Sequence, residues 1–298
     1  MRSSLVFLSS VFLIGCSTDF DPVWKINDLR ILAIRAEPPE VLVPIGTTTF
    51  PSVKIDGLVV DPQNPDALFD WELWACTAER NGCEEATKRT RVHKAKTKLS
   101  EIQLDFILGE ELYLAALKAD PFKGFGGVPV IVELRISQSP EPVVIGIKRI
   151  VYGNSIPAAK QPNQNPKFAE IQLDGEPISA PVSISKCQPV ELLPIPTDMS
   201  KENYLVATFS DPFNGRDLEE YLSFSFFATS GQLSFAFTGG KPSSVMINKK
   251  IEDVSSEWNN CDELGEPPPS GNATIWIVIR DDRGGVGWTS IQVTIQDN

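Results

Sequence analysis

The stretch F-D-W-E-L-W-A, residues 69–75, decides the fold class because its apolar residues fall at every second position. In an extended chain, one face then carries Phe69, Trp71, Leu73 and Ala75. A β-strand turns successive side chains to opposite faces, so a period of two predicts a strand that is buried on one side. This segment therefore predicts a sheet with one face packed against a core.

The same alternation recurs on both sides of this segment, in short runs that Pro, Gly and Asn separate. Before the middle of the chain, it includes Ile102, Leu104, Phe106 and Leu108, the run Leu112-Tyr113-Leu114, then Val130, Val132, Leu134 and Ile136, and a last strand with Val143, Ile145 and Ile147. After the middle, it includes Leu222, Phe224, Phe226 and Ala228, then Leu233, Phe235 and Phe237, the run from Ile275 to Ile279, and finally Ile291, Val293 and Ile295. Short strands at this spacing predict a sandwich or barrel. Helical periodicity is nearly absent, with at most one turn from Asp217 to Tyr221.

The two halves of the chain also look alike. Asp61-Pro62 and Asp211-Pro212 each follow an apolar run, at an offset of 150 residues. With a three-residue insertion, residues 71–75 lie over residues 224–228, so large apolar side chains recur at the same inward positions. A bulky aromatic on the third strand is what an immunoglobulin-like sandwich requires. Chance similarity is the alternative, because any two sandwiches share this alternation.

These patterns predict a mostly β protein with two tandem immunoglobulin-like β-sandwich domains after a lipoprotein signal peptide. We place the domains at residues 28–152 and 167–298. Residues 153–166 are rich in Pro and Asn and have nothing to bury, so we expect a linker between them.

The N-terminus predicts export. Residues 1–15 combine a basic start with an apolar run that is too short to cross a membrane, which is typical of a signal peptide. The segment Leu13-Ile14-Gly15-Cys16 resembles the lipobox of bacterial lipoproteins, which implies cleavage after Gly15 and lipid modification of Cys16 with acyl chains such as palmitate. Residues 16–27 would be the acylated tether. An ordinary signal peptide with a chance Cys is the competing interpretation.

The residue after the acylated Cys bears on the destination. In the best-known lipoprotein sorting system, an Asp there retains the protein in the inner membrane. This chain has Ser17 instead, so the resemblance implies the bacterial outer membrane, facing either the periplasm or the cell surface.

Cysteine arithmetic agrees with lipidation, since five cysteines leave an odd thiol in an exported protein. With Cys16 acylated, the other four can form two disulfides, with three connectivities open. We favour Cys76 with Cys83 and Cys187 with Cys261, the second of which closes a long loop. A zinc site competes with this interpretation, but no C-x-x-C occurs and the single His93 lies in a basic run, so we expect no metal.

Charge excludes one class of partner. The formal charge of −12 becomes −13 after cleavage, because Arg2 is the one charged side chain in the first fifteen residues. Binding to nucleic acid relies on a basic patch that neutralises phosphates, so we expect no nucleic-acid partner. No second long apolar segment follows the signal peptide, so acyl chains would be the membrane attachment.

A search for catalytic chemistry yields no site. A histidine-based triad is improbable with one His in a charged run, no G-x-S-x-G occurs, and Gly124-Phe125-Gly126-Gly127 lacks the Lys and Ser/Thr of a phosphate loop. Thirty-nine acidic residues would allow a carboxylate pair, but sequence does not place two across a cleft. We therefore predict no catalytic residues, no cofactor and no enzymatic activity.

Two loops invite closer inspection. The acids of Asp281-Asp282-Arg283-Gly284-Gly285 could bind Ca²⁺, but they lack the ligand spacing of a calcium loop and Arg280 and Arg283 flank them, so a Gly-containing turn is favoured. The insertion from Lys249 to Asn272 holds Trp258, Cys261 and three consecutive prolines, and either binds a partner or fills space.

The C-terminal segment from Ile275 to Trp288 resembles the closing hairpin of PKD and related immunoglobulin-like domains, which are usually adhesive or spacer modules. In the first half, the segment from Leu29 to Glu40 and residues 122–129 resemble uncharacterised bacterial surface lipoproteins. These resemblances imply no particular activity.

We therefore expect a lipid-anchored, non-enzymatic binding or scaffold protein of the cell envelope that contacts a protein or a glycan through loops or strand edges. One alternative is an accessory lipoprotein subunit of an envelope machine for secretion, motility or polymer export. A third is a carboxylate-based glycan hydrolase.

Overall fold

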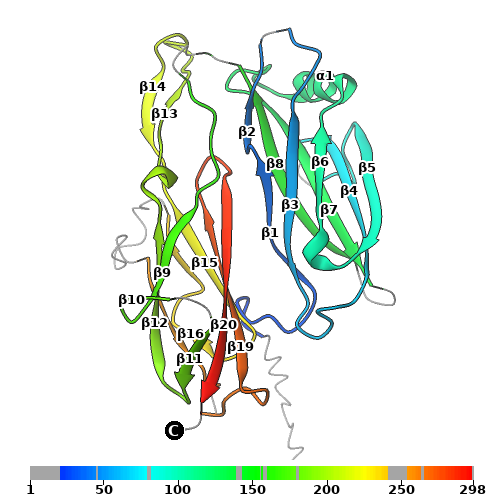
Figure 1. Ribbon diagram of the computed structural model, residues 1–298. Coiled ribbons are helices and arrows are strands. Elements are labelled where there is room, and N and C mark those ends of the chain that lie inside the picture. The colour runs from blue at the N-terminus through cyan, green and yellow to red at the C-terminus, as the bar shows by residue number, and fades with distance from the viewer. Residues whose placement is uncertain are drawn as a thin grey trace, which may run out of the picture.

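The computed structural model describes residues 21–44, 46–78, 82–138, 143–154, 156, 160–178, 181–240, 254–262 and 265–296. The chain is mostly β, which confirms the predicted fold class (Figure 1). The signal peptide and Cys16 lie outside the described residues, as do parts of the predicted linker and of the insertion from Lys249 to Asn272.

The first half of the chain forms two facing sheets. One is antiparallel with the order β1-β3-β6, with bounds Arg30–Glu37, Ser52–Val60 and Gln103–Ile107. The other has the order β2-β8-β7-β4-β5, with bounds Glu40–Leu42, Val144–Gly153, Val128–Ser137, Phe69–Thr77 and Arg89–Thr97; β2 runs parallel to β8 and the other pairs are antiparallel. Apolar side chains of both sheets meet in one buried core.

The second half repeats this plan. An antiparallel sheet has the order β10-β9-β12-β18-β16, with bounds Glu176–Pro177, Phe168–Leu173, Pro189–Pro196, Ser256–Asn259 and Gln232–Leu233. The facing sheet has the order β11-β20-β19-β15-β17, with bounds Val182–Ser185, Val286–Gln296, Asn272–Arg280, Ser223–Ala228 and Phe237–Gly239. A separate hairpin consists of β13, Asn203–Val206, and β14, Arg216–Glu219.

The strand orders confirm the internal repeat. In each half one sheet begins with an edge strand, β2 or β11, that pairs in parallel with the last strand, β8 or β20, and the remaining order of that sheet is the same. The smaller set β1-β3-β6 likewise matches β9-β12-β18. Strand β4 therefore corresponds to β15, as the alignment of residues 71–75 with 224–228 predicts. This order is that of an immunoglobulin-like sandwich with a C′ strand beside its G-F-C strands.

The two Asp-Pro turns are also equivalent. The Asp61 carboxylate accepts the backbone N–H and the side-chain amide of Asn64, at 3.1 and 3.2 Å. In the second half the Asp211 carboxylate accepts the same two groups of Asn214, at 3.1 Å each. An Asp side chain that bonds a backbone N–H a few residues on stabilises a turn, so the repeated motif has a local physical cause.

Two predictions about helices are wrong. The run that includes Leu112 is not a strand. It lies in α1, Glu110–Ala119, which buries Leu112 and Ala116 four positions apart on one face. Glu110 and Glu111 in the first turn and Lys118 in the last complement the helix dipole. The expected helical turn from Asp217 to Tyr221 is instead largely strand β14, which pairs with β13.

Two strands turn the opposite face from the one predicted. Ile145 and Ile147 on β8 are half exposed, whereas Lys148 on the alternate face is buried. Gly146 explains the register, because it lies against Ile31 and Ile34 of β1, where a β-carbon would come within 2.9 Å of their side chains. Phe235 and Phe237 are likewise exposed rather than buried, and only Phe237 begins a strand, β17.

The two halves pack against each other through a third apolar core. Buried residues from the outward faces of β1 and of β19–β20 form its centre: Leu32, Ala33, Val278 and Val286, with Ile26 from the N-terminal segment. Leu58, Val60, Phe227, Trp276 and Trp288 pack around them. This junction core holds the two sandwiches side by side (Figure 1). Among the described residues no helix is long and apolar enough to cross a membrane.

Candidate functional site

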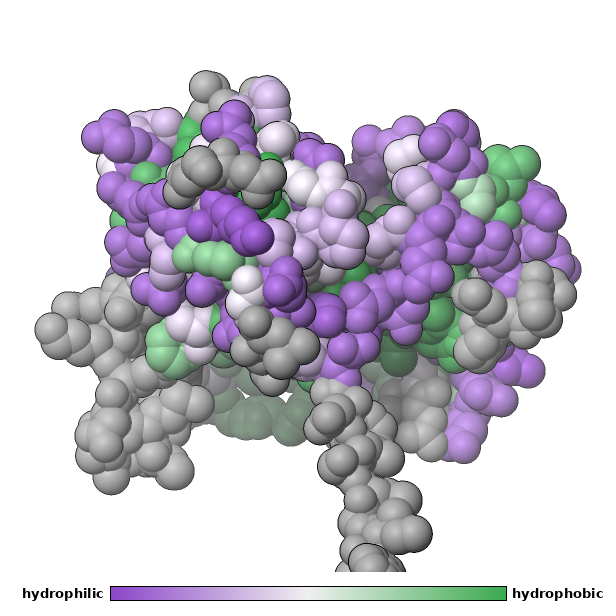
Figure 2. All heavy atoms as spheres, turned by 90° about the horizontal axis from the view of Figure 1, so that it is seen from below, coloured by the Kyte–Doolittle hydropathy of each residue, from purple (hydrophilic) through white to green (hydrophobic). Residues whose placement is uncertain are grey.

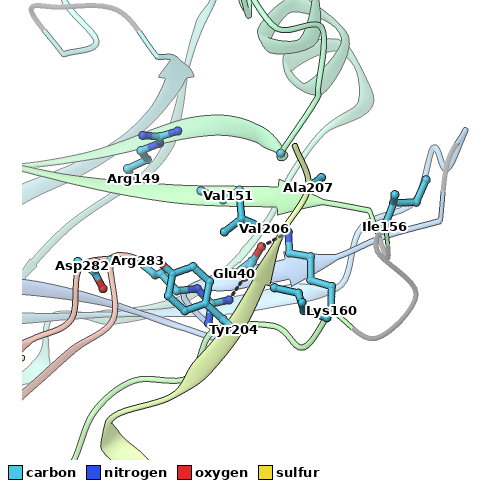
Figure 3. Close-up of a pocket in the computed structure, with 13 residues that line it drawn as sticks. Glu40, Arg149, Val151, Ile156, Lys160, Tyr204, Val206, Ala207, Asp282 and Arg283 are labelled. Carbon is cyan, nitrogen blue, oxygen red and sulfur yellow. Dashed lines mark hydrogen bonds and ion pairs between the residues drawn. The ribbon is translucent and has the colours of Figure 1, made fainter. Parts of the chain in front are cut away.

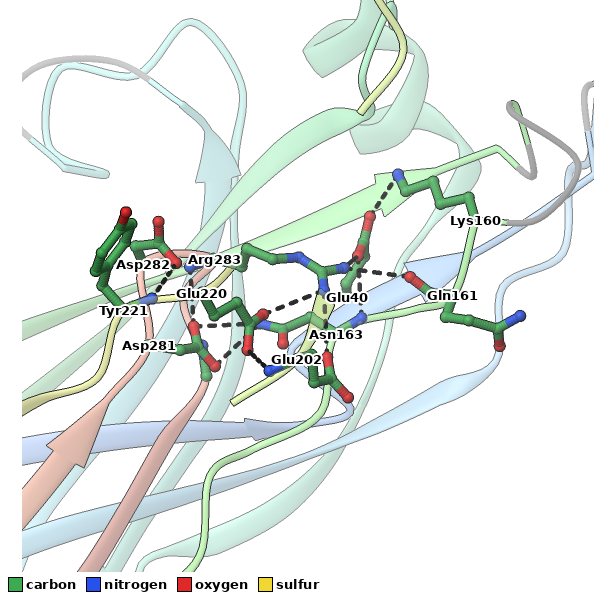
Figure 4. A network of polar contacts seen from close by, with 11 residues as sticks. Glu40, Lys160, Gln161, Asn163, Glu202, Glu220, Tyr221, Asp281, Asp282 and Arg283 are labelled. Atoms are coloured by element: carbon green, nitrogen blue, oxygen red, sulfur yellow. Dashed lines mark hydrogen bonds and ion pairs between the residues drawn. The ribbon is translucent and has the colours of Figure 1, made fainter. Parts of the chain in front are cut away.

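Arg283 connects three acidic side chains at the junction of the two halves (Figure 4). It lies in the turn between β19 and β20, and its guanidinium donates to Glu40 of the first half at 2.5 Å. The same group donates to Glu202 and to Glu220 of the second half, at 3.2 Å each. Tyr204 covers one side, with the guanidinium carbon 4.5 Å from its ring centroid. Because the Arg283 side chain is only 11% exposed, these charges interact with little screening by water.

The segment predicted to be a linker belongs to this network. The Asn163 backbone N–H donates to Glu40 at 3.0 Å, and its side-chain amide donates to Asp281 at 3.3 Å. The Asn165 side chain donates to the Ala36 carbonyl and accepts from the Val286 N–H, both at 2.8 Å, so it joins β1 to β20. Both asparagines are buried, and the expectation that this segment has nothing to bury is wrong.

Burial and charge pull the pKa values at the junction apart. Burial raises the pKa of Glu220 to about 7. Burial also opposes ionisation of Glu40, but its hydrogen bond to Lys160 and the charges of Lys160 and Arg283 lower the pKa below its usual value. Burial lowers the pKa of Lys148 to about 8. The Lys148 ammonium donates to the Gly284 carbonyl. The junction therefore contains groups whose charge changes near neutral pH.

The raised pKa of Glu220 predicts a specific pH dependence of stability. Folded Glu220 binds a proton more tightly than the unfolded chain does, so its contribution is present below about pH 4.5 and is lost as the pH rises through about 7. In Glu220→Gln this contribution is absent. From pH 5 to pH 8 we therefore expect the wild type to lose roughly 1–3 kcal/mol of unfolding free energy relative to the variant, measured by urea titration.

Glu219→Gln is the matched control, because Glu219 is adjacent in sequence but exposed, with its carboxylate paired to Lys201. We expect its unfolding free energy to change with pH in parallel with that of the wild type. Parallel pH curves for Glu220→Gln and the wild type would contradict the assignment.

A hollow of about 350 Å³ opens on one side of the network (Figure 3). Strand β8 contributes Arg149 and Val151, and the β13 hairpin contributes Tyr204 and the residues that follow it. Lys160 and Arg283 also line it, but both are paired with Glu40. Arg149 is paired with Ile131 through the backbone, but its side chain makes no hydrogen bond or ion pair with the part of the chain that the structure describes. The hollow therefore combines side chains of both halves around Arg149, whose guanidinium has no partner among the described residues.

A larger groove of about 900 Å³ lies on the other side of the junction core. It runs between β1 and β3 of the first half and β19 and β20 of the second. Trp276 and Trp288 line one wall, and Arg35 and Asp56 line the other. Each hollow is thus lined by side chains from both halves of the chain.

The structure confirms both favoured disulfides. Cys76 bonds to Cys83 across seven residues, and Cys187 bonds to Cys261 across 74 residues. The second bond ties the turn after β11 to the segment after β18, where the buried Asn260 side chain accepts from the Cys187 N–H at 2.7 Å. Cys261 thereby attaches the described part of the long insertion to the second sandwich. Cys16 remains a prediction.

Two further segments that the sequence analysis considered, the His93 run and the turn from Asp281 to Gly285, can also be located. His93 lies on β5, where its ring is 4.8 Å from the ring of Trp71. Within the described ranges, no group of three or more His, Cys, Asp or Glu side chains is arranged to hold a metal ion. The segment from Asp281 to Gly285 forms a turn, as favoured: Asp281 accepts the N–H of Gly285 at 2.7 Å and that of Arg283 at 2.9 Å.

Sequence reasoning missed the role of Arg283. It treated this residue as a neighbour of two acids in a hairpin turn, and its actual partners lie 63 to 243 positions away. A signal was nevertheless present, because Arg280 and Arg283 flank acids that a simple surface turn does not need. Glu40, at the end of the first apolar strand, gave no signal of its own.

Comparisons with known proteins identify no family for this chain. No family model matches the chain, and no curated protein matches it. Among solved structures it is similar to a transglutaminase of red sea bream, at 10% identity and a TM-score of 0.27, over 92% of this chain and 32% of that one. It is also similar to murine CEACAM1b, at 10% identity and a TM-score of 0.22, over 90% of this chain and all of that one. At these scores the likeness carries no argument about function.

Proposed function

We propose that this protein is a non-enzymatic binding module of the bacterial cell envelope, built from PKD-like sandwiches and held at the outer membrane by a lipid on Cys16. The observation that carries the proposal is the junction, which buries apolar side chains and the Arg283 ion pairs together. A junction of this kind holds both halves in one arrangement. Surfaces to which both halves contribute then need little reorganisation on binding, which favours recognition.

The state of the acids in the two hollows supports a binding rather than a hydrolytic function. A carboxylate-based hydrolase needs an acid and a second carboxylate that face the substrate. In the smaller hollow Glu40 already accepts from Lys160 and Arg283, and Asp282 accepts the Tyr221 N–H at 3.3 Å. In the groove Asp56 is held by Arg35 at 2.8 Å, and Asp61 caps its own turn. Glu220 has a raised pKa, as a general acid would, but its side chain is 1% exposed and lines neither hollow, so it does not face a substrate there.

The anchor is tested by Cys16→Ala. Without the thiol no diacylglycerol is attached, and two acyl chains are what makes such an anchor stable. We expect most of the protein to move from the membrane fraction to the soluble fraction, and the N-terminal acyl mass to disappear in mass spectrometry. The variant with both Cys76→Ala and Cys83→Ala removes two thiols elsewhere and should stay in the membrane fraction. Unchanged membrane association of Cys16→Ala would refute the anchor.

A second function, an accessory subunit of an envelope machine, is favoured by a group of exposed phenylalanines. Phe209 and Phe213 in the β13–β14 hairpin are each 75% exposed, and Phe122 of the first half is 57% exposed. Phe125 stacks on Phe209 with 4.4 Å between centroids. The hairpin lies at the top of Figure 1, at the end of the second sandwich opposite the C-terminus. Exposed apolar clusters mark sites of protein contact.

The two functions are separated by cross-linking in native membranes followed by affinity purification. A fixed set of envelope proteins that is recovered with the wild type and lost with Phe209→Ser would support the accessory-subunit function. Recovery of no protein partner would favour the binding module acting on a glycan.

A further inference from the structure

We propose that the groove between β1–β3 and β19–β20 binds a neutral glycan strand, with Trp276 and Trp288 as the stacking surface. The inference rests on the proposed binding function and names its ligand. Figure 2 shows a recess between two lobes at the lower end of the molecule. A groove of about 900 Å³ has room for several sugar rings.

The two tryptophans form one aromatic surface. In the β19–β20 ladder Trp276 lies opposite Ser290, and Trp288 lies opposite Val278, two positions along, so both indoles project from the same face. Arg35 holds the Trp288 ring from one side, with its guanidinium carbon 4.4 Å from the centroid. Arg35 is itself fixed by two hydrogen bonds to Asp56, at 2.8 and 3.2 Å. The stacking surface is therefore formed before a ligand arrives.

The indole N–H groups in the groove are available. Trp71, Trp74 and Trp258 each donate their indole N–H to an acceptor within the protein. Trp276 and Trp288 are half-buried, and neither donates to an acceptor within the described ranges. Because an indole N–H normally has a partner when its ring is packed, these two donors point to a polar ligand or water.

The remaining polar groups match sugar hydroxyls better than a charged ligand. Gln103 and Gln292 line the groove with side-chain amides that both donate and accept, as a hydroxyl does. Arg35, Lys54, Asp56 and Asp61 contribute no net charge, and Asp56 is paired with both cations. A pyranose presents C–H groups on its faces and hydroxyls at its edges. Its faces suit indole rings, and its edges suit amides.

A peptide strand fits the groove less well. Extended peptides bind by adding to a free sheet edge. Here β3 is paired on both sides by β1 and β6, and β19 by β15 and β20, so their backbone groups are already bonded. Among the described residues, β1 and the part of β20 before Val293 each keep one unpaired edge, but they line the groove only through Arg35, Trp288 and Gln292. The walls therefore offer side chains rather than backbone groups, which favours a ligand that is recognised by stacking and side-chain hydrogen bonds.

The test is isothermal titration of the full chain with β-1,4-linked hexasaccharides of glucose and of N-acetylglucosamine, with polygalacturonate as the charged comparison. We expect at least one neutral hexasaccharide to bind and polygalacturonate not to compete. Trp276→Ala should weaken binding at least about fivefold, which is the lower end of the effect of stacking a nucleobase on an aromatic side chain. Trp276→Phe, which keeps a ring but loses the N–H, should weaken it less.

Trp74→Ala is the matched control, because Trp74 is a half-buried tryptophan on β4 outside the groove and should leave affinity unchanged. Thermal unfolding of each variant establishes that the protein is folded. Absence of binding to both neutral hexasaccharides, or equal affinity of Trp276→Ala and wild type, would overturn the proposal. Tighter binding of polygalacturonate or of a protein partner at the same residues would also overturn it. The glycan proposal and the proposed function can fail separately. If no neutral glycan binds but Cys16→Ala still releases the protein from membranes, the ligand class is wrong and the lipid-anchored binding module is still supported.

Discussion

Arg283→Met is expected to lower the free energy of unfolding by about 3–5 kcal/mol at pH 7, the largest effect of any single substitution proposed for this protein. The change removes the cation that Glu40, Glu202 and Glu220 share and leaves their carboxylates buried without it. Glu40 retains Lys160 at 2.6 Å, so the loss falls mainly on the other two acids. Urea titration measures the difference.

The pH dependence distinguishes this mechanism from simple loss of packing. Glu220 has a pKa of about 7, and burial also raises the pKa of Glu202. Glu220 becomes neutral as the pH falls from 7 to 5, so the penalty for removing Arg283 should shrink over this range. Arg149→Met, a change of the same size at an exposed position in the same junction, should cost less than about 0.5 kcal/mol. A penalty that is the same at both pH values would show that the guanidinium acts through packing alone.

Replacing both Cys187 and Cys261 with Ala should cost about 4 kcal/mol, and replacing both Cys76 and Cys83 should cost about 2 kcal/mol. The loop-entropy relation produces this order, because the first bond spans 74 residues and the second spans seven. The first disulfide therefore restricts the unfolded chain more. Calorimetric unfolding under non-reducing conditions measures both differences.

The shorter disulfide is the control for removal of two buried sulfur atoms, since Cys76, Cys83 and Cys261 are all buried. Equal losses in the two double variants would show that local packing, rather than loop length, determines the contribution. A larger loss for the Cys76–Cys83 pair would contradict the loop-entropy account altogether.

Much of each sandwich could be predicted from local sequence. The alternation in residues 69–75 and 224–228 identified two equivalent strands, because inward positions in a sheet with one buried face must be apolar. The repeated Asp-Pro turn was visible because its hydrogen bonds join residues three apart. The failures share a cause as well. In β8, Gly146 and Lys148 face inward where β1 and the Gly284 turn lie against the strand, and no local pattern reports such neighbours.

The candidate sites depended almost entirely on distant contacts. Both favoured disulfides could be chosen from spacing, because Cys pairing reduces to a few alternatives. The Arg283 network joins residues from five parts of the chain. In the sequence, Trp276 and Trp288 look like ordinary apolar residues of a strand, and only the packing of the other half beside them makes a groove.

The sequence by itself indicated the β-sandwich class and the repeat and favoured the cysteine pairs, because side-chain period, short turns and thiol chemistry act over a few residues or among a few groups. Only the tertiary structure decided how the two halves meet. The apolar faces of β1 and β19–β20, the buried asparagines of the connecting segment and the Arg283 ion pairs select one packing arrangement. The groove between the two halves exists only in that arrangement.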